Sequence, residues 1–596
     1  MVRSLIHLPD EILNSILCYS SPQSCVAVEQ TNSRFRNVTN EPLLWRHHCQ
    51  SHYRFWDGRH DIHQRLAYPV NFTDWKALFV SKHQVDRSVT RLLDSIIGSQ
   101  TGRIEKFRRV IELGYDAKDT ILRHTQVESG DDHLARRWAT DSMRILPCAN
   151  HKRYYARALL TCLHRSIAIP EWAKLKRGDP VSLDRALGCF DLFISENGTE
   201  DLNEIRGSLD GILKRFVASH PDLDLFTPRQ KARAIASWLS ANGLTGIDPQ
   251  REYHSLEHNF LGMALKSPGH NSLPLVSAAI YCFVAQGIGL DARPCGFPFH
   301  VHVIVNPRPG SDMDGNALFR IEPGEPLYLD PFRGGMETPA SSLRDQLSFL
   351  GMSNMDQNAT LGAALTSSLV LRCGKNILNS VRAEPRNPTL HTTAIDVMSA
   401  KYAALWSVML LSSDSQPMDL RHQLPWLMEL FAADFPSDIF LVEQYIAPLF
   451  LGLFEHEHIL ESLHVMKAVD GIPKQVRRRS RGNANVQYLV GQVFRHRRYH
   501  YEAIITGWDS ECGAGEQWMR RMGIDRLEAG RHQSFYHVLV ADRSVRYVAE
   551  ENIEVILPRF ADLPSGLIAI AGKHFKRWDQ RKKMFVSNMK DEYPDD

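Results

Sequence analysis

Apolar residues recur at helical spacing at the start of the chain. Those on one face of the first helix are Leu8, Ile12, Leu13, Ile16 and Leu17. Proline suits a first helical position and acidic residues suit the positive end of the helix dipole, so Pro9, Asp10 and Glu11 mark its start. The pattern predicts three short helices in residues 1–50. So small a bundle buries little surface, and we therefore expect it to lean on a partner.

The middle of the chain changes from helical to mixed patterning. Residues 85–240 show helical periodicity throughout and predict a scaffold. Within 241–380, a charge-free helix precedes two extended runs, Val301 to Val305 and Leu327 to Leu329. This order predicts an α+β core, and residues 388–470 return to amphipathic helix.

The last part of the chain has a different pattern of apolar residues. Short runs of β-branched and aromatic residues, separated by glycines, fill residues 486–560. They predict a small antiparallel β barrel, preceded by a basic linker around Arg477 and followed by a basic tail over 561–596. The fold class expected for the whole chain is therefore multidomain α+β.

Composition narrows the protein class. At 596 residues, with 43% apolar and 23% charged residues, the chain fits a globular protein of several domains. Lys+Arg 70 against Asp+Glu 68 leaves a formal charge of +2, so any binding to nucleic acid or an anionic membrane must be local. The charge-free run from Asn271 to Leu290 carries proline and glycines, which favours a buried core helix over a membrane span.

Cysteine usage and the N-terminus bear on the compartment. The ten cysteines are scattered, with no CxxC pair and no zinc-ligand spacing, which indicates a reducing compartment. Pro9, Asp10 and Glu11 interrupt the apolar core that a secretory signal needs. We expect the protein in the cytoplasm, the nucleus or both.

The first segment resembles the F-box. The resemblance rests on Leu8-Pro9-Asp10-Glu11-Ile12-Leu13, Ser21-Pro22, Arg34-Phe35-Arg36 and Leu44-Trp45-Arg46. It implies docking on the adaptor subunit of a cullin-RING ubiquitin ligase, through an apolar helical surface. The residues expected to bind the adaptor are Leu8, Pro9, Ile12, Ile16, Leu17, Leu44 and Trp45. An ordinary helical bundle is the alternative.

The 241–335 region resembles the transglutaminase-like core. The marks are Asn271-Ser272-Leu273-Pro274, Gly296-Phe297-Pro298-Phe299-His300 and Leu329-Asp330-Pro331-Phe332-Arg333. In active members a cysteine opens the core helix, a strand histidine takes its proton and a carboxylate orients that histidine. His300 and Asp330 match the second and third positions, and the first has no match.

No good nucleophile accompanies this pair in the sequence. Cys282 lies eight residues beyond Pro274, about 12 Å along the helix axis, which removes it from the positive end of the dipole. Cys295 directly precedes the strand that carries the histidine, and Ser277 is read as a packing residue. We expect a retained fold with lost or altered chemistry. His302 shares a face with His300, but no third ligand is evident, so no metal or other cofactor is predicted.

The 486–556 segment resembles the YccV-like domain, also called the hemimethylated-DNA-binding domain. The carrying runs are Val490-Gly491-Gln492-Val493, Ile504-Ile505-Thr506-Gly507-Trp508-Asp509, Phe535-Tyr536-His537-Val538 and Glu550-Glu551-Asn552-Ile553. Nine basic and ten acidic residues in this segment argue against backbone binding to DNA, so a protein-binding barrel is preferred. Candidate contacts are Trp508, Trp518 and Tyr536, with core packing as the alternative for each.

Together the three resemblances match an F-box-only family that carries a C-terminal YccV-like domain. They imply a non-catalytic substrate-recognition subunit of an SCF-type ubiquitin ligase, which binds the adaptor, the cullin scaffold and an unknown protein substrate. The alternatives are a thiol or serine hydrolase or transamidase built on His300 and Asp330, and a DNA-binding protein that uses the basic flanks of the barrel. Membrane association is not expected.

Overall fold

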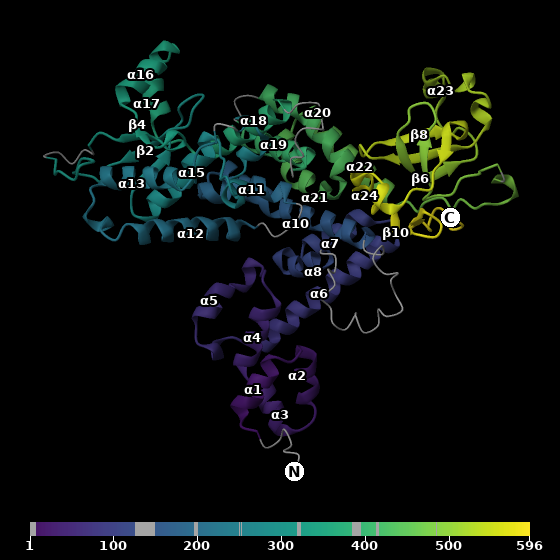
Figure 1. The fold of residues 1–596 in the computed structure, drawn as a ribbon, viewed down its shortest axis with the longest axis horizontal. Coiled ribbons are helices and arrows are strands. Elements are labelled where there is room, and N and C mark those ends of the chain that lie inside the picture. The colour runs from purple at the N-terminus through teal and green to yellow at the C-terminus, as the bar shows by residue number, and fades with distance from the viewer. Residues whose placement is uncertain are drawn as a thin grey trace. The chain divides into compact units, whose positions relative to one another are not determined.

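The chain divides into two compact units. The structure is a computed structural model that describes residues 8–125, 150–195, 201–248, 251, 253–318, 324–383, 395–412, 417–483 and 485–596. Unit 1 comprises residues 1–163 and 464–596, and unit 2 comprises residues 164–463, so unit 2 is inserted in the sequence of unit 1. Most elements are helices, with strands confined to two parts of the chain (Figure 1).

Four short helices open unit 1. They are α1 (Asp10–Cys18), α2 (Pro22–Glu29), α3 (Ser33–Thr39) and α4 (Pro42–His52). Side chains cap two of them, because the Ser21 hydroxyl accepts from Ser24 N and the Asn32 amide oxygen accepts from Phe35 N. Their shared core consists of Leu13, Leu17, Cys25, Val38 and Leu44. The sequence predicted three helices in residues 1–50, and the described residues of this segment form four.

A second helical layer follows in unit 1. It contains η2 (Gly58–His60), α5 (Ile62–Ala67), η3 (Val70–Phe72), α6 (Trp75–Gly98), α7 (Arg103–Ile111), η4 (Gly114–Ala117) and α8 (Lys118–Thr125). The buried Lys82 on α6 ties this layer together, since its ammonium donates to Phe55 O at 2.6 Å and Asp116 O at 2.9 Å. It also pairs with the Asp116 carboxylate at 3.1 Å. Such a network fixes the loop after α4 on α6.

The early and late parts of unit 1 contact each other. Helix α10 (Asn150–Lys176) begins here, and the Tyr155 hydroxyl donates to Lys573 O at 3.0 Å. His151 Nδ1 bonds Gly572 O, and Gln100 N donates to the Asp591 carboxylate at 3.2 Å. These bonds join segments more than 400 residues apart in the sequence.

Unit 2 combines many helices with one small sheet. Its first helices are α11 (Leu183–Ile194), α12 (Leu202–Ser219), η6 (Leu223–Leu225), α13 (Pro228–Ala241), η7 (Leu256–Asn259), α14 (Leu261–Lys266) and α15 (Pro274–Gly287). Strands β1 (Asp291–Pro294), β2 (Val303–Asn306), β3 (Leu327–Asp330) and β4 (Met336–Glu337) pair antiparallel in chain order. Val303 lies opposite Leu329, so both predicted extended runs become neighbouring strands.

Helices complete unit 2 after the sheet. They are η8 (Pro331–Arg333), α16 (Ala340–Phe349), α17 (Asn354–Leu361), α18 (Thr366–Ala383), α19 (Val397–Leu411), α20 (Pro417–Asp434), η9 (Pro436–Asp438), α21 (Ile439–Leu441), η10 (Val442–Ile446) and η11 (Ala447–Phe450). The next helix, α22 (Phe454–Gly471), leads from unit 2 back into unit 1. In the described part of the chain, no helix combines the length and the apolar character needed to cross a membrane.

The C-terminal part of unit 1 is a five-stranded antiparallel sheet. Its strands are β5 (Val493–His496), β6 (Glu502–Asp509), β7 (Phe535–Val540), β8 (Val545–Ala549) and β9 (Ile553–Val555), in the order β8-β7-β6-β5-β9. Short helices lie between them and beside them: η12 (Arg481–Asn483), α23 (Glu516–Met522), η13 (Ile524–Arg526), η14 (Gly530–His532), η15 (Glu550–Asn552) and η16 (Phe560–Asp562). The predicted β-rich segment is therefore present.

Residues 561–596 are folded, which corrects the expectation of a basic tail. They form α24 (Ser565–Ala571) and a hairpin of β10 (Phe575–Asp579) and β11 (Met584–Ser587). The apolar side chains of Phe575, Trp578 and Phe585 join the core of the five-stranded sheet. The backbone of Gly491, with a φ of 98°, bonds Phe585 N at 2.8 Å, where a Cβ would collide with Phe585 O. Apolar burial therefore outweighs the repulsion among the basic residues.

Candidate functional site

A histidine and a carboxylate meet at the sheet of unit 2. His300 stands in the loop before β2, next to Phe299, whose φ is 65°. Asp330 ends β3 and caps η8, accepting from Phe332 N at 3.2 Å and Arg333 N at 3.3 Å. One oxygen of this carboxylate lies 2.9 Å from His300 Nε2. The two residues expected to pair from the sequence are therefore in hydrogen-bond contact.

The surroundings favour an ionised Asp330. Burial opposes its ionisation, but the hydrogen bond with His300, the two histidine rings and the backbone N–H of Arg333 outweigh burial, so its pKa lies below the usual value. His302 lies beside the pair, and burial lowers its pKa to about 4, with nearby His300 acting in the same direction. The arrangement can orient the His300 imidazole through its hydrogen bond with Asp330.

No candidate nucleophile reaches this imidazole in the described residues. The buried Ser277 hydroxyl lies 2.7 Å from Ser272 Oγ and accepts from Gly246 N at 3.0 Å. Burial raises the pKa of Cys282 well above that of a free thiol, and that of Cys295 as well. Neither sulfur has a hydrogen bond to His300 within the segments described. In the described residues, the Ser277 hydroxyl therefore bonds Ser272 and Gly246 and has no hydrogen bond to His300.

Metal binding finds little support at this place. The His300 and His302 rings have centroids 5.2 Å apart, and His302 Nδ1 is buried without a hydrogen-bond partner. Within the described ranges, no group of three or more histidine, cysteine, aspartate and glutamate side chains could hold a metal ion. Two imidazoles alone fall short of the ligand sets typical of zinc.

Two residues near the pair, Tyr253 and Arg372, were not singled out from the sequence. The Phe332 ring meets His300 edge-on at 5.7 Å and Tyr253 at 6.0 Å. The Arg372 guanidinium donates to Phe297 O at 2.6 Å. Burial raises the phenol pKa of Tyr253, and the charge of Arg372 opposes that rise in part. Tyr253 and Arg372 lie far from the motifs in sequence, so only the fold reveals their position.

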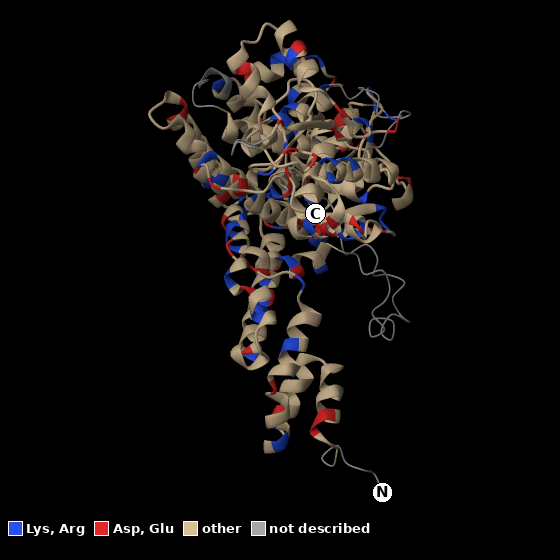
Figure 2. Ribbon diagram, turned by 90° about the vertical axis from the view of Figure 1, so that its left-hand side faces the viewer, with Lys and Arg blue, Asp and Glu red and all other residues tan. Residues whose placement is uncertain are grey.

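The surface of the N-terminal helices is partly apolar. Ile12 and Ile16 on α1 keep 48% and 43% of their surface exposed. Tyr19, Val26 and Leu43 are also exposed. The helices carry few charged positions, as the largely tan ribbon nearest the N-terminus in Figure 2 shows. A partner can therefore cover apolar side chains here without burying many charges.

Part of the predicted adaptor-binding set is internal, which corrects that expectation. Leu17 and Leu44 fill the core of the four helices. Trp45 packs with Trp75 and Phe79, and its indole N–H donates to Thr39 O at 2.7 Å. These three side chains support the helices from inside and are not available for direct contact with a partner. Of the predicted set, Leu8 is half-buried and Pro9, Ile12 and Ile16 are exposed.

Two of the three aromatic candidates in the C-terminal sheet are also internal. Trp508 and Tyr536 retain 2% and 0% exposure, so neither ring is open to a partner, and this expectation is corrected. The Trp508 indole donates to the Asp596 carboxylate at 2.9 Å, and the Tyr536 hydroxyl donates to Glu550 at 2.7 Å. Trp518 on α23 is half-buried beside Tyr547, with ring centroids 5.8 Å apart.

The arginines before the sheet are paired with carboxylates. Arg477 contacts Asp509, Arg478 lies 3.1 Å from Asp595, and Arg479 lies 2.7 Å from Asp596. This basic run therefore packs with the C-terminal sheet, and its positive charge is partly neutralised by these carboxylates. The basic residues of the β10–β11 hairpin remain exposed, namely Lys573, Lys576, Arg577, Arg581, Lys582 and Lys583.

Comparison with known families places three matches along the chain. Residues 5–51 match the family described as F-box-like, and residues 203–373 match the transglutaminase-like superfamily. Residues 486–582 match the family described as hemimethylated DNA-binding protein YccV like. The second match begins well before residue 241, so helices α12 and α13 belong with the α+β core.

Three curated proteins of one name are similar to part of this chain. F-box only protein 21 of Mus musculus is 26% identical over 330 residues, which are 54% of this chain and 49% of the relative. The proteins of that name from Pongo abelii and Homo sapiens are each 25% identical over 334 and 330 residues, or 48% and 49% of their lengths. The matches thus span about half of each relative. No solved structure matches the chain. The chain is therefore similar to F-box only protein 21 over part of its length, and it carries segments that match the F-box-like, transglutaminase-like and YccV-like families in that order.

Proposed function

We propose that this chain is a substrate-recognition subunit of an SCF-type cullin-RING ubiquitin ligase. The observation that carries the proposal is the exposed apolar surface on an F-box-like bundle whose own core is already filled. An adaptor subunit that covers this surface removes apolar area from water, which stabilises the complex. The cullin scaffold would be reached through that adaptor, in the cytoplasm or the nucleus.

In this role the chain itself is non-catalytic. The ligase subunits transfer ubiquitin, and the downstream segments bind the substrate and raise its effective concentration near the transfer site. The transglutaminase-like segment supports this view. In the described residues, no serine or cysteine side chain is hydrogen-bonded to the His300–Asp330 pair, and the Ser277 hydroxyl bonds Ser272 instead. We infer that it serves as a binding or structural module. A thiol or serine hydrolase built on the pair has no supporting contact.

The test is affinity purification of the full chain followed by mass spectrometry. The Ile12→Glu/Ile16→Glu variant buries two charges in the proposed interface and should lose the adaptor and the cullin. Val80→Glu places the same charge on an apolar position of α6 with 42% exposure and should keep both. Retention of the adaptor by the double variant would contradict the proposal. Proteins that remain bound to both variants would be candidate substrates.

A further inference from the structure

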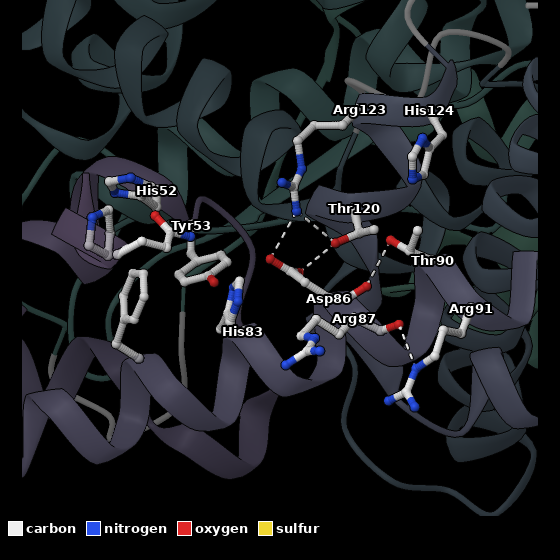
Figure 3. Close-up of a pocket in the computed structure, with 13 residues that line it drawn as sticks. His52, Tyr53, His83, Asp86, Arg87, Thr90, Arg91, Thr120, Arg123 and His124 are labelled. Atoms are coloured by element: carbon white, nitrogen blue, oxygen red, sulfur yellow. Dashed lines mark hydrogen bonds and ion pairs between the residues drawn. The ribbon is translucent and has the colours of Figure 1, made fainter. Parts of the chain in front are cut away.

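A basic pocket lies beside the F-box-like helices, inside unit 1. It has a volume of about 650 Å³ and is lined by the start of α2, the end of α4, one face of α6 and the end of α8. Figure 3 shows its labelled side chains, most of which come from α6 and α8. Pockets of this size hold small ligands or single side chains of a partner. None of its residues belongs to the His300 centre or to the exposed face of α1.

Positive charge dominates the lining. Arg87 and Arg91 project from α6, Arg123 projects from α8, and all three are exposed. Among the described lining residues Asp86 is the one carboxylate, and it pairs with Arg123 at 2.9 Å and accepts from the Thr120 hydroxyl. The one negative charge is therefore already balanced inside the pocket wall.

Arginine donors remain open to a ligand. Arg123 uses the same nitrogen, Nη2, for its contacts with Asp86 and Thr120, so its other N–H groups are not engaged by these two bonds. Arg91 donates through Nε to Arg87 O at 3.3 Å, which holds its side chain along the helix. Guanidinium groups bind phosphoryl oxygens through paired N–H donors and keep their charge at any physiological pH.

Three histidines, His52, His83 and His124, line the pocket together with the arginines. Burial, together with the charges of Lys152 and Arg123, lowers the pKa of His124 to about 4. His124 is therefore neutral near pH 7, and the positive charge that a bound anion would meet comes from the arginines.

The ring-bearing end of the pocket suits the organic part of a ligand. Tyr53, Phe79 and His83 lie together there, and the Phe79 and His83 rings stack with centroids 6.4 Å apart. A small inorganic anion would leave this end empty. A phosphate attached to a carbon chain would use both ends, the charged one for the phosphate and the aromatic one for the chain.

We propose that this pocket binds a phosphate monoester, with Arg87, Arg91 and Arg123 supplying charge and N–H donors to the phosphoryl oxygens. The phosphate could be carried by a small molecule or by a phosphorylated side chain of a bound protein. The proposal stands on the pocket alone and does not require the adaptor role.

The test is calorimetric titration of the full chain at constant ionic strength. The probes are inorganic phosphate, O-phosphoserine, a phosphoserine peptide and the same peptide without phosphate. Saturable binding of the phosphorylated probes is expected, at least tenfold weaker in Arg87→Ala/Arg91→Ala. The matched control Arg109→Ala removes an exposed arginine from α7, outside the pocket, and should bind as the wild type does.

The pattern of affinities identifies the source of the phosphate. Tighter binding of the phosphopeptide than of O-phosphoserine would indicate a protein ligand, and equal binding would indicate a small phosphorylated molecule. Absence of saturable binding to every probe, or equal affinity of the double variant and the wild type, would overturn the proposal. Thermal unfolding of the wild type in phosphate against sulfate gives a second readout, since a specific ligand raises the melting temperature. The Arg87→Ala/Arg91→Ala variant should still co-purify with the adaptor. Loss of phosphate binding in this variant can therefore be distinguished from failure of the proposed adaptor role.

Discussion

The two exposed isoleucines of α1 offer a quantitative test of the proposed interface. Complete burial of an isoleucine side chain contributes about 1.5 to 3 kcal/mol. Because Ile12 and Ile16 are already about half-buried in the free chain, a partner that covers them would gain roughly 1 kcal/mol from each. The Ile12→Ala/Ile16→Ala variant should therefore bind the adaptor with a free energy weaker by about 2 kcal/mol, or roughly 30-fold in Kd.

The assay is a direct titration of purified adaptor with wild-type and variant chains. Val80→Ala is the matched control, because Val80 has similar exposure on α6 and should leave the Kd unchanged. Leu13→Ala is a contrasting variant that opens the core of the bundle and should lower its stability by about 2 to 5 kcal/mol. Circular dichroism separates the two effects. A Kd for the double alanine variant within twofold of wild type would refute the reasoning.

Buried groups give three further expectations. Trp578→Ala should lower the free energy of unfolding by about 3 to 5 kcal/mol in urea titrations, and a loss below about 1 kcal/mol would mean that the hairpin core does not carry the stability ascribed to it. Burial opposes ionisation of Asp116, but hydrogen bonds with Arg59 and the charge of Lys82 outweigh it and bring the pKa to about 2. The ionised carboxylate therefore stabilises the fold above about pH 4, and this contribution disappears as the pH falls toward 2. Asp116→Asn should then cost about 2 kcal/mol at pH 7 and progressively less in acid, and a pH-independent difference would contradict the assignment. Iodoacetamide should leave Cys282 unlabelled in the folded chain, as shown by mass spectrometry, whereas labelling that His300→Ala abolishes would restore the enzyme hypothesis.

Local patterns in the sequence predicted several features well. The strand pair of unit 2 follows from two short extended runs, and the contact between His300 and Asp330 was expected from the resemblance to the transglutaminase-like core. The β-rich character of residues 486–556 is likewise a local property, since alternation and glycine spacing report it directly.

Features that depend on distant segments were harder to predict. From the sequence, Trp45 was predicted to lie on the surface of a small bundle. In the structure it packs against Trp75 and Phe79 of α6, and no local sequence pattern predicts this contact. In residues 561–596 the basic side chains dominate the composition and hide the apolar residues that alternate with them. Arg479 looks like part of a solvated run, yet its partner Asp596 lies 117 residues away. Tertiary contact decides each of these cases.

The inserted position of unit 2 has a consequence for synthesis. Unit 1 needs residues from both sides of unit 2, since Tyr155 bonds Lys573 and Gln100 bonds Asp591. A ribosome adding about 5 to 20 residues per second spends roughly 15 to 60 seconds on the 164–463 stretch. During that time the ends of α6 and α10 that later receive the C-terminal hairpin are still uncovered. Chaperones that shield apolar and hydrogen-bonding surface on a nascent chain therefore have a defined interval in which to act on this half of the molecule, and unit 2 can complete its own core first.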